Sequence, residues 1–322
     1  FMSYRRIYPF LWLAVSLNAS AFEKDTIRIG AMASGTLAWE LQAMKDQGLL
    51  DNAGFDLNIT PLANQQAGKV ALQANSVDMI ISDWIWVSSM RSEGIPFTFT
   101  PYSNSAGGLL VAANSDIKTL QDLKAKKLGI AGGELDKNWL LLQALGSQQG
   151  LDLGQSVEKV YGSPPLLEQQ LKAGRIDAIL TYWQFAARLE TEGYRQLMSG
   201  EDIIRQLGIS ESVPSLGYVF RQNWADQHKA SLQGFLQLAA KARDKLCSDN
   251  EAWQKVVYLT ESNEPATQKK IHERYCEGRV ANWSAKNQAA AKQIYNWLNT
   301  ISQNKLGGKS TELEAGSFWS AE

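Results

Sequence analysis

Two stretches of the sequence repeat one pattern: Val77-Asp78-Met79-Ile80-Ile81-Ser82-Asp83-Trp84 and Ile176-Asp177-Ala178-Ile179-Leu180-Thr181-Tyr182-Trp183. In each, an Asp precedes a short apolar run that ends in a hydroxyl residue, and a Trp follows two positions later. Asp78 corresponds to Asp177 and Trp84 to Trp183 at one constant offset of 99 residues. Such a run is typical of a buried strand, and the carboxyl ends of strands in open α/β sheets carry the binding crevice. The repeat predicts two copies of one α/β lobe, each with a Trp at its rim.

Each copy of the pattern closes a series of alternating strands and helices. In the first half we expect strands at 26–32, 55–60 and 77–82, with helices at 37–48 and 67–74. In the second half we expect strands at 127–131, 157–161 and 177–181, with helices at 140–150 and 164–173. A β-α-β-α-β order predicts a parallel sheet with right-handed crossovers.

Two further strand-like segments connect the halves. The outbound segment is 97–113 and the return segment is 215–220, and two adjacent crossings form a hinge. The chain from Ala225 to Ser302 has helical periodicity, and we expect these helices to pack on the first lobe. The polar tail from Gly307 to Glu322 predicts loose order.

The expected fold class is therefore α/β, with two lobes, a mostly parallel sheet flanked by helices in each, and a two-segment hinge. The expected divisions are a signal peptide at 1–21, the first part of lobe 1 at 22–102, lobe 2 at 103–214, the return to lobe 1 with the C-terminal helices at 215–306, and the tail at 307–322.

The first 21 residues have the order of a secretory signal peptide. Arg5-Arg6 is basic, Tyr8 to Leu17 is mostly apolar, and Ala19-Ser20-Ala21 is a small-residue cleavage site. The apolar part is too short to span a bilayer. We expect cleavage after Ala21 and a periplasmic location, and the alternative is a buried N-terminal helix.

Charge and composition exclude several classes of function. Removing Arg5 and Arg6 leaves 30 basic against 33 acidic residues, a net charge of −3. This balance predicts no nucleic-acid partner and no acidic membrane surface. Cys247 and Cys276 either pair as a disulfide in an oxidising compartment or remain buried thiols. Because only two His are present, we expect no metal site and no cofactor.

Candidate ligand-binding residues follow from the strand ends and helix starts. They are Ser34, Gly35, Thr36, Trp39, Asn64, Asp83 and Trp84 in the first lobe, Glu134, Trp139, Ser163, Tyr182 and Trp183 in the second, and Ser103, Asn104 and Tyr218 on the crossings.

Aromatic and acidic side chains dominate this set, which bears on the ligand class. Three carboxylates lie near the strand ends, and each would repel an anion at about 4 Å by roughly 4 kcal/mol. A cation over a Trp ring gains about 0.5–2 kcal/mol. These values favour a cationic or heteroaromatic solute. The simpler alternatives are that Trp86 and Trp139 are core residues, that Asp83 caps a helix, and that Glu134 and Asp136 are helix-start charges.

Four motifs together resemble the periplasmic solute-binding proteins of ABC importers, of the nitrate, sulfonate and taurine type. They are Ile27-Arg28-Ile29-Gly30 after the exported start, Leu72-Gln73-Ala74-Asn75-Ser76-Val77-Asp78, Leu120-Gln121-Asp122-Leu123-Lys124-Ala125-Lys126-Lys127-Leu128-Gly129-Ile130, and Leu171-Lys172-Ala173-Gly174-Arg175-Ile176-Asp177-Ala178. The resemblance covers residues 26–220. Related proteins that bind thiamine-pyrimidine precursors often carry Trp-Glu-Pro where this chain has Trp183-Gln184-Phe185, which argues against that ligand.

The resemblance implies a periplasmic-binding-protein fold and a monomer that captures a small solute between its lobes. It also implies delivery to a membrane permease and no enzymatic activity. Three alternatives remain. One is the same protein binding an aliphatic sulfonate or a taurine-like anion. The second is a periplasmic sensor or adaptor, and the third is an enzyme like the thiamine-pyrimidine synthases.

Overall fold

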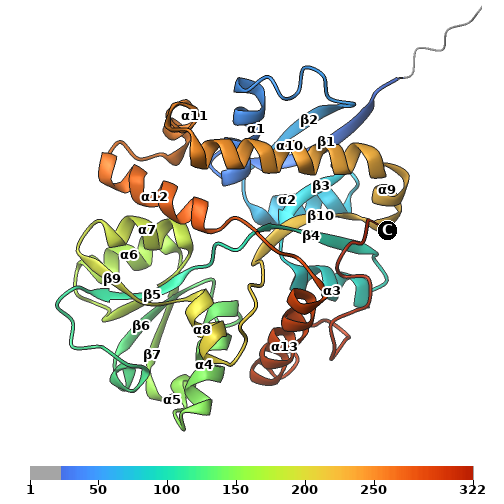
Figure 1. Cartoon of the computed structure of the whole chain (residues 1–322). Helices are drawn as coiled ribbons and strands as arrows, with labels where there is room; N and C mark the ends of the chain where they lie inside the picture. The colour runs from blue at the N-terminus through green and yellow to red at the C-terminus, as the bar shows by residue number, and fades with distance from the viewer. Residues whose placement is uncertain (1–22, 322) are drawn as a thin grey trace, which may run out of the picture.

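The computed structural model describes residues 23–321 and has two lobes, each built around one sheet (Figure 1). The predicted signal peptide at 1–21 lies outside the described residues. Within residues 23–321, no helix combines the length and apolarity needed to cross a membrane.

The first sheet has the strand order β2-β1-β3-β10-β4. Its strands are β1 (Asp25–Met32), β2 (Phe55–Leu62), β3 (Met79–Ser82), β4 (Phe97–Ser103) and β10 (Leu216–Arg221), and its helices are α1 (Thr36–Asp46), α2 (Gln65–Gln73) and α3 (Trp84–Ser92). Neighbouring residues of β3 point to opposite faces, because Met79 packs in the cluster under α1 and Ile80 in the cluster under α2 and α3. Both faces are therefore buried, as a parallel sheet requires.

The second sheet has the order β7-β6-β8-β5-β9. Its strands are β5 (Gly108–Ala112), β6 (Lys127–Ala131), β7 (Glu158–Gly162), β8 (Ala178–Thr181) and β9 (Tyr194–Ser199), and its helices are α4 (Lys137–Gln148), α5 (Leu153–Ser156), α6 (Pro164–Lys172), α7 (Trp183–Glu190) and α8 (Gly200–Gln206), with the short 3₁₀ helix η1 (Leu120–Leu123) before β6. α6 and α7 cover one face, and α4 and α8 cover the other.

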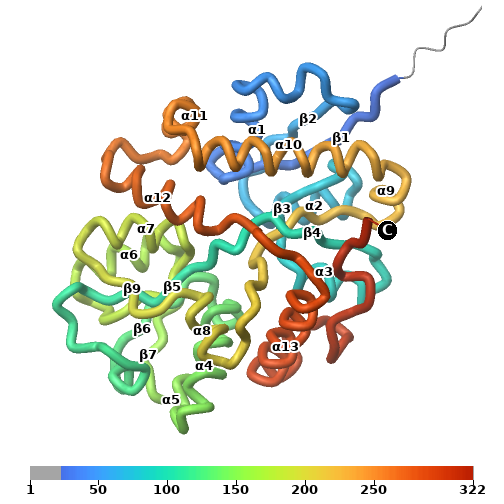
Figure 2. The backbone as a smooth tube through the Cα atoms, viewed as in Figure 1, coloured from blue at the N-terminus to red at the C-terminus, as the bar shows by residue number. Residues whose placement is uncertain are grey.

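The two sheets share one topology, which confirms the α/β fold of two similar lobes. In each, the first strand of the repeat pairs in parallel with the second and the third, and one strand from outside the repeat, β10 or β5, lies antiparallel beside the third. Figure 2 shows the chain passing between the lobes after β4 and again before β10.

The repeated Asp residues hold equivalent strand pairs together. Asp78 accepts the backbone N–H of Arg28 at 2.9 Å and pairs with its guanidinium at 2.8 Å. Asp177 accepts the backbone N–H of Lys127 at 2.8 Å. Arg28 and Lys127 are themselves 99 residues apart, so both Asp residues have the same structural role, at the ends of the sheets where these strands begin.

The C-terminal helices cover more than the first lobe. They are α9 (Gln222–Gln227), α10 (Lys229–Ser248), α11 (Asn250–Gln254), η2 (Val257–Thr260), α12 (Pro265–Glu277) and α13 (Ala285–Ser302). α10 packs on α1 and the first sheet, but α13 lies between α3 of the first lobe and α4 of the second (Figure 1). One apolar cluster therefore runs from Trp84 through Leu298 to Leu140. The expectation that all these helices pack on the first lobe was only partly right.

The tail is ordered against β4, contrary to the sequence expectation. Phe318 forms a parallel bridge with Phe99, whose N–H donates to Ser317 O at 2.9 Å. The N–H of Trp319 donates to Phe99 O at 2.8 Å, and the Phe318 ring packs on Trp84. The tail thus covers the free edge of the first sheet. Its order comes from Phe318 and Trp319, although the residues around them are mostly polar.

A buried arginine joins four elements of the first lobe. Arg243 of α10 donates to Tyr102 O of β4 at 2.6 Å, to Glu40 Oε2 of α1 at 3.1 Å and to the Tyr275 hydroxyl of α12 at 3.2 Å. Its guanidinium also lies 4.5 and 4.8 Å from the ring centroids of Tyr102 and Tyr275. Thr36 belongs to the same network, because its hydroxyl bonds that of Tyr102 at 2.6 Å.

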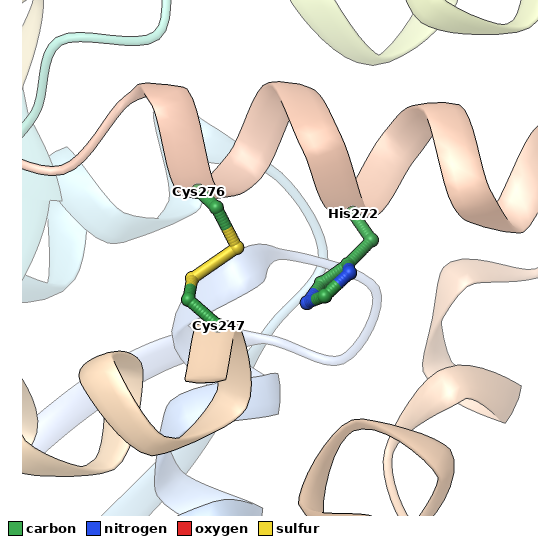
Figure 3. Close-up of side chains that lie close together, drawn as sticks. All are labelled: Cys247, His272 and Cys276. Carbon is green, nitrogen blue, oxygen red and sulfur yellow. A yellow bond between two sulfur atoms is a disulfide. The ribbon is translucent and has the colours of Figure 1, made fainter. Parts of the chain in front are cut away.

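Cys247 and Cys276 form a disulfide that ties α12 to α10 (Figure 3). Their Cα atoms are 5.7 Å apart and 29 residues apart in the chain. His272 lies beside the disulfide, stacks on Trp253 at 4.3 Å and bonds Leu246 O at 2.7 Å. Because the two sulfur atoms are bonded to each other, they are not available as thiolate ligands in this state.

We expect the double variant Cys247→Ser, Cys276→Ser to lose about 3–4 kcal/mol of unfolding free energy, because a loop of this length loses its cross-link in the unfolded chain. Urea unfolding of the variant and of the wild type, each with and without a reductant, measures this loss. Reductant should destabilise the wild type and leave the variant unchanged. Equal stability of the oxidised wild type and the variant would contradict the expectation.

Candidate functional site

Three helices at the junction between the lobes begin with side-chain caps. Asp83 accepts the N–H of Trp86 at 2.7 Å, Asp136 accepts that of Trp139 at 3.0 Å, and Asn64 accepts that of Ala67 at 2.8 Å. These caps satisfy backbone N–H groups that the helix itself leaves free. The structure therefore shows the capping alternative for Asp83, and it places Asp136 at a helix start as expected, where it also caps the helix.

Charges from the two lobes meet at this junction. Lys137, at the start of α4, lies close enough to Asp83 of the first lobe and to Asp136 for both carboxylates to act on it. Burial lowers the pKa of Lys137, and the two carboxylates oppose that shift. Burial also raises the pKa of Asp136 to about 6. The strand ends of the two lobes thus face each other across a polar, partly desolvated contact.

Tyr182 lies beside this group on the second lobe. A Cβ at position 132 would lie 2.9 Å from both the Tyr182 hydroxyl and Asp136 Oδ1, and Gly132 has a φ of +88°. Glycine is needed here for both reasons. Tyr182 is 45% exposed, and burial of its inner part, together with the charge of Asp136, raises its pKa.

The start of α1 lacks a side-chain cap. Gly35 is the N-cap residue and makes no side-chain bond, and the first turn contains no acidic residue. Ser34 is exposed beside it. α7 likewise begins after Tyr182 with no side-chain cap and no acid in its first turn. Uncapped helix starts attract an acidic group, since their N–H groups and dipole favour negative charge.

Three of the expected ring contacts are instead core contacts. Trp39, Trp84 and Trp139 are each 1% exposed. The Trp84 N–H donates to Pro214 O at 3.1 Å, and that of Trp39 donates to Leu259 O at 3.2 Å. Trp39 also packs on Trp253 and Tyr275. Tyr218 is buried too, between Tyr102 and Phe235. Of these four residues, only Trp139 lines a pocket, the one between α4, β7 and the end of α13, and none lines the pocket beside Trp183.

Trp183 and Asn104 do line a pocket, which we call the edge pocket because the edge strands β4 and β9 end there. Its volume is about 260 Å³. It is lined by Asn104, Ser105, Ala106, Trp183, Ala186, Ala187, Gln196, Ser199, Glu201, Asp202, Arg274, Glu277 and Gly278. Ser103 lies behind it, with its hydroxyl accepting the N–H of Ser105 at 3.0 Å.

The remaining candidates lie away from these groups. Glu134 lines another pocket, with Lys159 and Lys305, between α4, β7 and the end of α13. Ser163 is exposed at the start of α6. Neither residue lines the edge pocket.

The sequence interpretation missed the acidic wall of the edge pocket. Glu201 and Asp202 follow β9, and that strand was not predicted because its Arg and Gln interrupt the apolar alternation. Arg274 and Glu277 belong to α12, whose position depends on contacts distant in the chain. The Ser199-x-x-Asp202 capping box was the one local signal for the start of α8.

A family model described as NMT1/THI5 like matches residues 41–252. The chain belongs to this family. The matched range begins after β1 and includes β2 to β10 and all of α10, so NMT1/THI5-like membership rests on most of the parts that build the two lobes.

Two curated relatives from Escherichia coli strain K12 are similar to this NMT1/THI5-like chain. The L-cystine-binding protein TcyJ is 32% identical over 137 residues, 42% of this chain and 47% of the relative. A putative aliphatic sulfonates-binding protein is 32% identical over 177 residues, 53% of this chain and 52% of the relative. The chain spans about half the length of the curated relatives it matches.

Solved structures show the same fold at lower identity. The periplasmic aliphatic sulphonate binding protein SsuA from E. coli has a TM-score of 0.70 and 21% identity, covering 89% of this chain and 95% of that one. The alkanesulfonate-binding protein SsuA from Xanthomonas axonopodis pv. citri, bound to MOPS, has a TM-score of 0.68 and 20% identity, covering 93% and 99%. These likenesses show the two-lobed periplasmic-binding-protein fold.

Burial predicts unequal effects for the two repeated tryptophans. Trp84→Ala removes a core ring and leaves Pro214 O without its donor, so we expect a loss of about 3–5 kcal/mol in unfolding free energy. Trp183→Ala removes a half-buried ring and should cost less. Urea unfolding of both variants measures the difference, and equal losses would show that the two rings are equally buried in solution.

Asp136 predicts a specific pH dependence of stability. The pKa of Asp136 is about 6 in the folded protein against 3.8 for the ordinary group, so the folded state binds more protons between these values. This group therefore lowers stability as pH rises from about 4 to about 6. Asp136→Asn keeps a capping side chain and carries no charge. We therefore expect the unfolding free energy of the variant, relative to that of the wild type, to increase as the pH rises from 4 to 7.

Urea unfolding at both pH values tests this expectation. Asp152→Asn, at the side-chain cap of α5, is the matched control for exchanging Asp for Asn at a cap. If the difference in unfolding free energy between wild type and Asp136→Asn stays constant with pH, the expected role of Asp136 is contradicted.

Proposed function

We propose that this protein is the periplasmic solute-binding component of an ABC-type importer. The observation that carries the proposal is the polar contact between two lobes of equal topology, where Asp83 of one lobe faces Lys137 of the other. In α/β sheets of this kind, ligands bind outside the carboxyl ends of the strands. Family membership and the names of the curated relatives support the same function.

We infer a zwitterionic organic solute, with one acidic group and one ammonium group. The uncapped starts of α1 and α7 offer N–H groups to a sulfonate or carboxylate. Asp83 and Asp136 offer carboxylates to an ammonium. L-cystine, which one curated relative is named as binding, carries both kinds of group.

This solute class changes the expectation from the sequence. The aromatic part of that expectation depended on several Trp rings at the rim, and Trp39, Trp84 and Trp139 are in the core. A purely heteroaromatic solute therefore loses its stacking partners at the junction. A plain sulfonate, the other class expected, satisfies the helix starts but meets two carboxylates, Asp83 and Asp136, with only the ammonium of Lys137 to offset them.

The mechanism is capture and delivery without covalent chemistry. The solute enters between the lobes, and closure about the crossings near 103–107 and 213–215 encloses it. Closure is favoured only as far as the solute contacts both lobes. The monomeric, closed protein then docks on a membrane permease and releases its cargo.

Thermal unfolding of residues 22–322 with a panel of solutes tests the proposal. The panel contains taurine and neutral amino acids, cystine included, with ethanesulfonate as the acid alone and ethylamine as the amine alone. A zwitterion at about 100 times its Kd should add roughly 2.7 kcal/mol to stability, which raises Tm by a few degrees. The single-group compounds should add much less.

Asp83→Asn sharpens the test, because it keeps the cap of α3 and removes the charge. We expect it to weaken zwitterion binding at least about tenfold, while the matched cap variant Asp152→Asn binds as the wild type does. Stabilisation by ethanesulfonate equal to that by taurine would refute the zwitterion. If no solute stabilises the protein, importer function fails, and the sensor or adaptor alternative gains support.

A further inference from the structure

The edge pocket is separate from the junction described above. None of Thr36, Asp83, Asp136 or Lys137 lines it. One wall comes from the second lobe, through α7, β9 and the start of α8. The opposite wall comes from α12, which the disulfide and Arg243 hold to the first lobe. The chain between β4 and β5 forms the floor.

The charges around the edge pocket do not balance. Arg274 bonds Glu190 at 2.6 and 3.1 Å and Glu277 at 2.8 Å, so one guanidinium serves two carboxylates. Asp202 pairs with Arg205 at 3.0 Å. Glu201 is half-buried and has no hydrogen bond or ion pair with the residues that the structure describes. Two negative charges therefore remain uncompensated.

The carboxylates of Asp202 and Glu277 lie close enough to Glu201 to act on its ionisation. Burial raises the pKa of Glu201, Arg205 opposes that shift, and the charges of Asp202 and Glu277 add to it. A cation placed among these groups would relieve their repulsion.

A buried amide oxygen without a partner also lines the edge pocket. Asn104 is 8% exposed, and its Oδ1 accepts no hydrogen bond from the described residues, although its Nδ2 donates to Arg279 O at 3.4 Å. The hydroxyl of Ser105 beside it is buried and unpartnered too. Leaving such acceptors unsatisfied costs about 1–3 kcal/mol each. The absence of a side chain at Gly278 leaves room for the Ser105 hydroxyl, because a Cβ at position 278 would collide with Ser105 Oγ.

These acceptors suit an organic ammonium better than a metal ion. Among residues 23–321, the carboxylates of this pocket do not bring three oxygen ligands within 4.8 Å of one another. An ammonium donates up to three diverging hydrogen bonds, and an aromatic ring such as that of Trp183, which lines the pocket, attracts a cation. An anion would meet uncompensated negative charge.

We propose that the edge pocket binds a small primary ammonium compound, held by Glu201, Asn104 Oδ1 and the ring of Trp183. Two uncompensated carboxylates and a volume of about 260 Å³ fit a short diamine. The bound amine lies between the start of α8 and the α12 wall, and thereby stabilises the arrangement seen here. The proposal stands without the importer function, because Glu201 and Asn104 lie outside the junction and because it uses the ring of Trp183, not the N–H groups at the start of α7.

Isothermal titration with 1,4-diaminobutane at constant ionic strength tests the proposal. We expect one site per chain, and Glu201→Gln should weaken binding at least about tenfold because it removes an uncompensated charge. Glu251→Gln, on the exposed start of α11, is the matched control and should bind as the wild type does. Asp83→Asn should also leave diamine binding unchanged, which separates this site from the proposed solute site.

Tetramethylammonium and Mg²⁺ are the ligand controls. Tetramethylammonium carries the charge without N–H donors, and we expect it to bind at least about tenfold more weakly than the diamine. Absence of diamine binding, binding unaffected by Glu201→Gln, or tetramethylammonium binding as tight as the diamine would each overturn the proposal. Tighter binding of Mg²⁺ that displaces the diamine would overturn it in favour of a metal site.

Discussion

The arrangement of the first lobe depends on the buried guanidinium of Arg243. It reaches α1 through Glu40, β4 through the carbonyl of Tyr102 and α12 through Tyr275. Removing one partner of such a buried pair leaves a charge without compensation, which costs about 3–5 kcal/mol. The hydroxyl of Tyr102 carries the network to Thr36. One interaction thus sets both the start of α1 at the junction and the α12 wall of the edge pocket.

Much of the fold could be predicted because the chain repeats itself. Asp78 and Asp177 mark equivalent strands. Each accepts a hydrogen bond from a backbone N–H, and the two donors, Arg28 and Lys127, are also separated by the repeat length of 99 residues. The helices between them have clear apolar periodicity. Local patterns failed where distant contacts decide the structure: α13 lies between the lobes, and the polar tail is held by Phe318 and Trp319 on β4. The partner of α13 cannot be identified from its own residues, and Phe318-Trp319 is the one local signal that the tail packs on the fold.

The candidate site was harder to predict for the same reason. Trp84 and Trp183 occupy equivalent positions at the starts of α3 and α7. The first is buried because Tyr295 of α13 and Phe318 of the tail pack on it. At α7 the covering element is α12, which packs along that helix but leaves Trp183 half-buried beside the edge pocket. A repeat in sequence predicts equal positions in each lobe, but the parts of the chain that do not repeat determine which side chains stay accessible.

The strand order has a consequence for how the chain folds. β10 lies between β3 and β4 in the first sheet, although it follows the whole second sheet in the chain. β3 and β4 therefore have no direct pairing to make, and the first lobe stays incomplete until β10 is added. The second sheet, from β5 to β9, is one continuous piece of chain. Because pairing over a long loop is entropically slow, we expect the second lobe to form first and the first lobe to be completed last, when β10 inserts between β3 and β4.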